Sequence, residues 1–225
     1  MSYTDQKISE LKDDLTSRHL SHEEIFQKHI VDGDTYFFQS VLGDKSKEYQ
    51  VKSLIAGYLG VHIHEVIFVG SAKLGYSLNP KNLYREFDSK FRSTRLTKDK
   101  SDLDIAVVSN SLFNSISHSI FEYTDAFRDK WTQNEYYFGG KEDAFGVPIC
   151  FKYFEYFSKG WFRPDMKPKG YEFCITKTFE QMKKELFDNF RRKTGLGIYQ
   201  DWYFFKNYHI NNLKALSYRV ETEII

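Results

Sequence analysis

The segment KSDLDIAVVS (100–109) places two aspartates, Asp102 and Asp104, at the start of an apolar run. Residues i and i+2 of a strand point to the same face, so these carboxylates converge while Leu103 and Ile105 face the other way. Two like charges this close are unfavourable unless a cation neutralises them, and a divalent ion is the simplest one. Alone, such a pair is typical of a solvated strand end, so its interpretation depends on a second motif.

That second motif is the segment VIFVGSAKLGYS (66–77). Gly70, which follows the strand VIFV, permits a tight turn and a close approach of the backbone to a ligand, and Ser71 can donate to an oxygen. AKLGYS is typical of the start of a short helix, where backbone N–H groups favour an anion. Lys73, one turn after Ser71, is either a phosphate contact or an exposed helix lysine. The two motifs together predict phosphate donors beside metal ligands.

The pair of motifs resembles the nucleotidyltransferase superfamily typified by DNA polymerase beta. The matching residues are VGSAKLGYS (69–77) and SDLDIAVVS (101–109), within a stretch of about 45 residues, 65–109. The spacing from the Gly-Ser pair to Gly75 is also similar to that of bacterial enzymes that make cyclic-oligonucleotide messengers. Each half is a weak signal, and the combination is a fairly specific one.

The resemblance implies roles for four residues of this chain. Gly70 and Ser71 would bind the triphosphate of an incoming nucleotide. Asp102 and Asp104 would coordinate two divalent ions, Mg²⁺ or Mn²⁺, that activate the attacking hydroxyl and steady the leaving pyrophosphate. Catalysis in such a site consists mostly of positioning and charge neutralisation.

The resemblance also implies a third carboxylate on a later strand, and several acids are candidates for it. Glu172, in YEFCIT, is the first candidate, and Asp165, in FRPDMKP, is the second. Asp143 and Glu155 are less well placed. The sequence leaves this choice open.

An α+β fold must position these motifs, with a small mixed sheet of the nucleotidyltransferase type between helical ends. We expect a helical N-terminal segment (1–60), a core (61–176) and a helical C-terminal part (177–225), packed as one unit. The capping-box pattern SHEE (21–24) and Gly60 are predicted to begin and end helices. Further elements are expected as strands at 66–69, 103–109, 171–176 and 195–200, and as helices at 47–60, 110–130 (capped by Asn110 or Ser111), 178–193 and 201–219, with a buried helix face within 151–162.

The segment 78–100 is predicted to be a long basic loop with a short helix. It carries seven Lys or Arg residues against three acids. Because it leads directly into the strand with the two aspartates, its cations are expected near the metal site. They either steer a triphosphate or a nucleic-acid backbone, or form a solvated loop.

Composition limits the remaining alternatives. The 21 Phe, 16 Tyr and 3 Trp residues supply a sizeable core, and the net charge of +1 argues against binding nucleic acid through global charge. Cys150 and Cys174 lack metal-site spacing and are expected to be free thiols in a reducing compartment. The polar N-terminus and the absence of an apolar run of about 20 residues predict a cytoplasmic protein without a membrane span.

The sequence therefore predicts a Mg²⁺-dependent transferase that moves an NMP from an NTP to a hydroxyl. The acceptor is a nucleotide, an RNA end, a protein or a small molecule. The alternative is a catalytically weak relative that binds a nucleotide or a partner protein, such as an antitoxin or a phage-defence component. Whether a third carboxylate meets Asp102 and Asp104 distinguishes the two.

Overall fold

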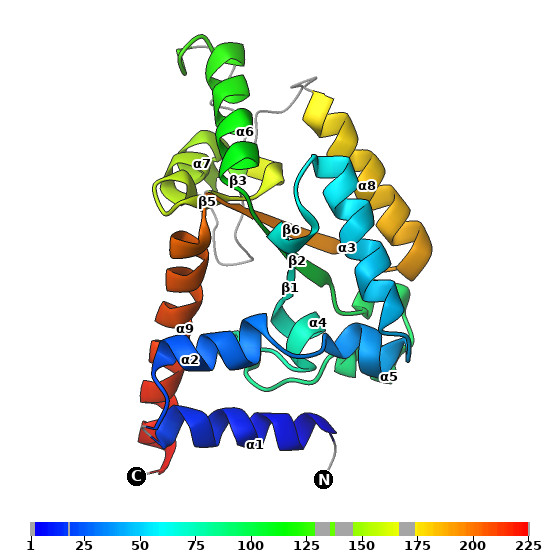
Figure 1. The fold of residues 1–225 in the computed structure, drawn as a ribbon, viewed down its shortest axis with the longest axis vertical. Coiled ribbons are helices and arrows are strands. Elements are labelled where there is room, and N and C mark those ends of the chain that lie inside the picture. The colour runs from blue at the N-terminus through cyan, green and yellow to red at the C-terminus, as the bar shows by residue number, and fades with distance from the viewer. Residues whose placement is uncertain (1–2, 18, 129–135, 138–145, 167–173, 225) are drawn as a thin grey trace.

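The computed structural model has the predicted α+β class, with helices around a four-stranded mixed sheet (Figure 1). It describes residues 3–17, 19–128, 136–137, 146–166 and 174–224. The helices are α1 (Tyr3–Thr16), α2 (His22–Phe26), α3 (Ser46–Leu59), α4 (Gly70–Leu74), α5 (Ser89–Thr94), α6 (Asn110–Tyr123), α7 (Ile149–Phe157), α8 (Cys174–Phe190) and α9 (Trp202–Ile224). The strands are β1 (Val66–Val69), β2 (Leu103–Val108), β3 (Tyr136–Tyr137), β4 (Val147–Pro148), β5 (Trp161–Phe162) and β6 (Thr194–Tyr199).

The main sheet has the strand order β1-β2-β6-β5. β2 runs antiparallel to β1 and parallel to β6, and β5 closes the other edge antiparallel to β6. β1 and β2 are almost continuously apolar because helices cover both faces of the sheet. In this register Asp104 lies between Val69 of β1 and Gly195 of β6. The second motif and the C-terminal strand therefore both adjoin the aspartate.

Two apolar cores lie on opposite faces of the sheet. Leu103, Ile105 and Val107 of β2 belong to the core that includes residues of α3, α6 and α8. Ala106 and Val108 belong to the other core, which includes residues of α1, α2 and α9. Figure 1 shows α3 and α8 side by side on one flank, with α1 and α2 crossing one end of α9. Within the described residues, no helix is both long and apolar enough to cross a membrane.

Several local predictions are confirmed. Ser21 and Glu24 form the expected capping box at the start of α2. Gly60 ends α3 in the left-handed conformation, with φ of 63°. The strands at 66–69 and 103–108, the short strand at 194–199 and the last helix are present, and 78–100 is a loop that contains only the six-residue helix α5 and two short turns of 3-10 helix.

Two local predictions are wrong. Residues 174–176 belong to α8 rather than to a strand, because the amphipathic pattern of 178–193 extends further toward the N-terminus; 171–173 lie outside the described residues. The cap of α6 is Ser109, whose side chain accepts from the N–H of Leu112, and not Asn110 or Ser111. The helix begins at Asn110, as expected, and ends at Tyr123, before the expected end at 130.

Candidate functional site

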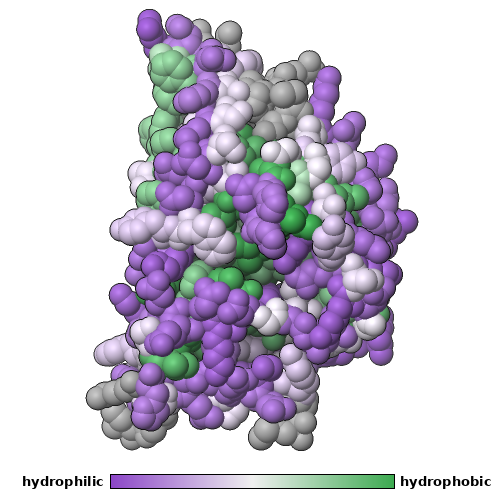
Figure 2. Space-filling model, viewed as in Figure 1, coloured by the Kyte–Doolittle hydropathy of each residue, from purple (hydrophilic) through white to green (hydrophobic). Residues whose placement is uncertain are grey.

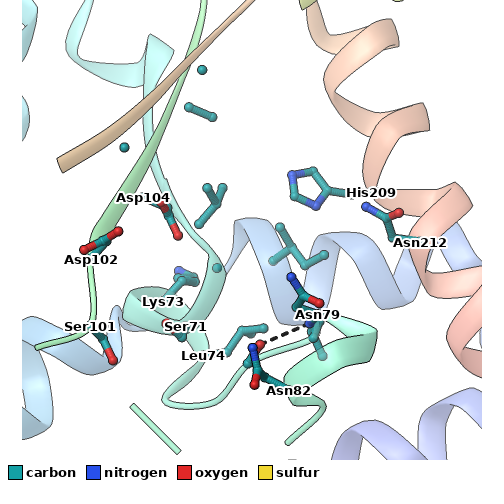
Figure 3. A pocket seen from close by; sticks show the side chains of 18 of the residues that line it. Ser71, Lys73, Leu74, Asn79, Asn82, Ser101, Asp102, Asp104, His209 and Asn212 are labelled. Atoms are coloured by element: carbon teal, nitrogen blue, oxygen red, sulfur yellow. Dashed lines mark hydrogen bonds between the residues drawn. The ribbon is translucent and has the colours of Figure 1, made fainter. Parts of the chain in front are cut away.

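The two aspartates of the first motif lie at the edge of one cleft. Asp102 immediately precedes β2 and Asp104 is the second residue of that strand, so both point away from the core that buries Leu103. Both line a cleft of about 1010 Å³, and Figure 3 shows them two residues apart at the start of β2. Gly70 and Ser71, at the start of α4, line it as well. The structure thus brings the two motifs together.

Two glycines make room for the Asp104 carboxylate. Gly70 has a φ of +65°, and a Cβ there would lie 2.9 Å from Asp104 Oδ2. A Cβ on Gly195 would collide with Asp104 Oδ1. The carboxylate therefore occupies a slot that exists only because both neighbouring residues lack a side chain.

Asp104 is an ionisable group without a partner among the residues that the structure describes. Within the described part of the chain, its carboxylate accepts no hydrogen bond and forms no ion pair. Burial, together with the nearby charge of Asp102, raises its pKa to about 6, while Arg163 acts in the opposite direction. A hard divalent cation stabilises such a carboxylate pair, so the donor set fits Mg²⁺ or Mn²⁺.

Asp102 lies closer to solvent and closer to cations. Burial raises the pKa of its carboxyl, while the positive charges of Lys193 and Arg192 lower it. Both carboxylates thus favour the neutral form more than a free aspartate does. A cation bound between them would remove that cost.

A buried ion pair fixes the residue that precedes Asp102. Arg192 donates from Nη1 to Asp88 Oδ1 at 2.6 Å and from Nη2 to Asp88 Oδ2, and its Nη1 also reaches the Ser101 carbonyl oxygen at 3.1 Å. The backbone N–H of Ser101 donates to Asp88 Oδ1, and the N–H of Asp88 donates to Ser101 Oγ, both at 2.9 Å. The guanidinium lies over the rings of Phe37 and Phe87, 5.1 and 4.9 Å from their centroids. We call Asp88, Ser101 and Arg192 the clamp.

Lys73 lines the cleft from a buried position on α4. It is only 7% exposed, so the prediction of an exposed helix lysine is wrong. Its ammonium donates to the carbonyl oxygens of Gly33 at 2.6 Å and Val31 at 3.3 Å, and burial lowers its pKa. It therefore fastens α4 to the segment after α2. A phosphate contact through Lys73 stays a prediction and would compete with these two carbonyls.

No third carboxylate joins the pair among the described residues, which contain no cluster of three His, Cys, Asp or Glu side chains. Asp165 is exposed and accepts from Arg163 at 2.7 Å. Glu155, on α7, pairs with Lys152 and Lys159. Glu172 and Asp143 lie outside the described residues.

The cleft carries an excess of positive charge. Among its described lining residues, eight are Lys or Arg and three are Asp. Lys90 pairs with Asp99 at 2.5 Å, whereas Arg85, Lys98 and Lys193 form no ion pair within the described residues. These cations, together with the unpartnered carboxylates, suit a ligand that combines a polyanion with a divalent metal.

The wall of the cleft opposite the aspartates comes from α9 and was missed by sequence reasoning. It includes Tyr208, His209 and Asn212. Figure 3 shows His209 and Asn212 across from Asp104. Burial lowers the pKa of His209 to about 4, so its ring is neutral at pH 7. The residues follow no recognisable motif, and only their helical spacing places them on one face. Figure 2 shows hydrophobic residues exposed in the middle of this view, with further hydrophobic patches along its left side.

The fold and the site define an α+β protein with a carboxylate pair in a basic cleft. Comparison with known proteins adds no family: the chain matches no protein-family model, no curated protein and no solved structure. Any functional conclusion therefore depends on the geometry of the cleft.

Proposed function

We propose that this chain is a nucleotidyltransferase that transfers an NMP from an NTP to a hydroxyl with the help of Mg²⁺ or Mn²⁺. One observation carries the proposal: a single cleft combines a Gly-Ser turn with two carboxylates and several cations that form no ion pair within the described residues. Nucleoside triphosphates bind proteins as metal complexes, and carboxylates plus substrate phosphates are the usual ligands of Mg²⁺. The sheet would be of the nucleotidyltransferase type.

Asp102 and Asp104 would hold the metal, which when bound neutralises the phosphates and makes the acceptor hydroxyl a better nucleophile. Ser71 and the glycine turn would contact the triphosphate, and Lys98 and Lys193 would add positive charge. The acceptor oxygen would bond to the α-phosphorus while the bond to the bridging oxygen breaks, and pyrophosphate leaves. The acceptor proton would pass to water or to a carboxylate.

A second candidate function is nucleotide binding without efficient transfer. Its support is that no third acid accompanies the aspartate pair in the described residues and that glycine occupies the position opposite Asp104 on β6. A protein of this kind would act as an antitoxin or a phage-defence component. A cytoplasmic location, and RNA or a protein as acceptor, stay predictions.

Both candidates predict metal-dependent nucleotide binding. ATP, GTP, CTP and UTP are each tested with the wild type. A nucleotide that binds should raise the melting temperature, because it binds the folded state and not the unfolded chain. We expect this rise only when Mg²⁺ or Mn²⁺ is present. The double variant Asp102→Asn/Asp104→Asn should lose this shift. A variant that responds like the wild type would show that the cleft is not the site.

Turnover separates the two candidates. Incubation with α-labelled ATP, Mg²⁺ and a cell extract should transfer label to an acceptor and release pyrophosphate if the chain is a transferase. Binding that is followed by neither product would support the binding-protein alternative.

Gly195→Ala is expected to damage the site more than the fold. Its Cβ would collide with Asp104 Oδ1, so the carboxylate must move. Overpacking of this kind costs about 1–3 kcal/mol of stability. The metal-dependent thermal shift should disappear.

Gly57→Ala is the matched control. Nothing lies within 4 Å of a Cβ at this position of α3, so we expect slightly higher stability and an unchanged shift. An intact ligand response in Gly195→Ala would contradict the assigned position of the metal.

A further inference from the structure

The cleft has two chemically different ends. At one end lie Asp102 and Asp104, with Lys193 close to Asp102. At the other, α9 contributes the phenol of Tyr208, together with the imidazole of His209 and the amide of Asn212, which lie across from the amide of Asn82 (Figure 3). A ligand that spans the cleft therefore needs a charged end and a neutral polar end. Inorganic polyphosphate has only the first.

Tyr208 presents an aromatic surface to the cleft. Its ring packs edge-on against Trp161 at 5.3 Å and lies 6.0 Å from the Tyr199 ring, and Tyr199 is buried. The residue is nevertheless 39% exposed, so part of the ring remains open. A ring held from behind by other aromatic rings loses little freedom when a planar ligand stacks on it.

Asn212 lies one turn further along the same face of α9. Burial raises the pKa of Tyr208, and a hydrogen bond from the Asn212 amide acts in the opposite direction. That bond uses one N–H, which leaves the second N–H and the carbonyl oxygen of Asn212 for a ligand. An amide of this kind offers one donor and one acceptor side by side.

Among the described residues of α9 that line the cleft, Arg219 is the one cation. It lies about two turns beyond Asn212 and donates to the Pro80 carbonyl oxygen at 3.4 Å. The His209 ring is buried, and its Nε2 has no hydrogen-bond partner among the described residues. The available groups are therefore neutral. A neutral amide matches a heterocycle that presents a hydrogen-bond donor next to an acceptor better than a heterocycle that presents two acceptors.

We propose that the α9 wall is the nucleobase subsite of the cleft, with Tyr208 stacked on the base and Asn212 selecting adenine over guanine. The proposal rests on the proposed function, which supplies the nucleotide. Asparagine pairs in two contacts with the N6 amino group and N7 of adenine, whereas guanine presents two acceptors that arginine or lysine matches better. In this orientation the base of the nucleotide lies against α9, and its phosphates lie at the other end of the cleft, beside Asp102 and Asp104.

The test measures dissociation constants of ATP, GTP and tripolyphosphate, each with Mg²⁺, by calorimetry. The wild type should bind ATP more tightly than GTP, and tripolyphosphate more weakly than either. Asn212→Ala should weaken ATP roughly tenfold, bring the ATP-to-GTP ratio close to one and leave tripolyphosphate unchanged. Tyr208→Leu should weaken both nucleotides roughly tenfold and again spare tripolyphosphate.

Two control variants on α9 test whether the effects are specific to Tyr208 and Asn212. Asn211→Ala and Tyr218→Leu alter exposed residues that do not line the cleft, so all three constants should stay at wild-type values. Asn212 is exposed, so its truncation removes no core contact and the fold should persist even if Tyr208→Leu fails to fold.

The outcomes separate this proposal from the proposed function. If tripolyphosphate binds as tightly as ATP, the base subsite is overturned, while the assignment of the phosphates to the aspartate end of the cleft is retained. A preference for GTP, or an unchanged ratio in Asn212→Ala, would overturn the adenine assignment. If neither tripolyphosphate nor ATP binds, the proposed function and the subsite fail together.

Discussion

Asp104→Asn is expected to make the metal-free protein more stable while it abolishes metal-dependent nucleotide binding. The carboxylate is buried, has no hydrogen-bond partner among the described residues and has a pKa raised to about 6. A raised pKa means that the ionised form destabilises the fold at neutral pH, by about 3 kcal/mol for a shift of this size. Asparagine removes that charge, so the melting temperature at pH 7.5 should rise by about 6–12 °C.

The effect should depend on pH in a defined direction. Above pH 6, Asp104 is ionised in the folded state, and its destabilisation is fully present. As the pH falls from 6 toward 4, the folded protein takes up a proton that the unfolded chain does not bind, so the wild type gains stability relative to the variant. The difference between the two melting temperatures should therefore vanish near pH 4.

Asp13→Asn, at an exposed position of α1, is the matched control and should change stability by less than about 0.5 kcal/mol. Thermal melts from pH 4 to 8 without divalent metal measure all three proteins. An Asp104→Asn variant that is less stable than the wild type at pH 7.5 would show that a protein group stabilises the carboxylate.

The second large effect is expected in the clamp. Arg192→Met should destabilise the protein by about 3–5 kcal/mol, because the buried Asp88 carboxylate loses its counter-charge. The start of β2 should lose its fixed position, since Arg192 also holds the Ser101 carbonyl. Metal-dependent nucleotide affinity should therefore fall, although Arg192 does not line the cleft. Urea unfolding and calorimetry measure the two effects.

The neighbouring Arg191 supplies the control. Its ion pair with Asp188 is exposed and 3.7 Å long, so Arg191→Met should cost less than about 1 kcal/mol. Adding Asp88→Asn to Arg192→Met removes the orphaned charge and should recover part of the loss. Equal effects of Arg191→Met and Arg192→Met would refute the role of the clamp.

Local signals in the sequence were sufficient for much of the fold. The capping box at Ser21, the left-handed Gly60 and the β-branched runs before Gly70 and after Asp102 act over a few residues, so their structural consequences follow from short segments. The convergence of the two motifs on one cleft was predictable for the same reason, because strand alternation fixes the face of Asp104.

Features set by distant contacts could not be predicted. Asp88 and Arg192 are 104 residues apart, and neither has a local pattern that reveals its partner. Lys73 was misjudged because its carbonyl partners lie about 40 residues earlier in the chain. Asn212 belongs to the cleft only because α9 packs back across the sheet, which no motif encodes.

The central claim is that Asp102 and Asp104 hold a metal ion that binds with a nucleotide. Titration of Mn²⁺ with ATP present, followed by electron paramagnetic resonance of the free ion, tests it most directly. We predict that the wild type removes Mn²⁺ from solution beyond what ATP alone binds and that Asp104→Asn does not. Equal Mn²⁺ uptake by the wild type and Asp104→Asn would contradict the claim.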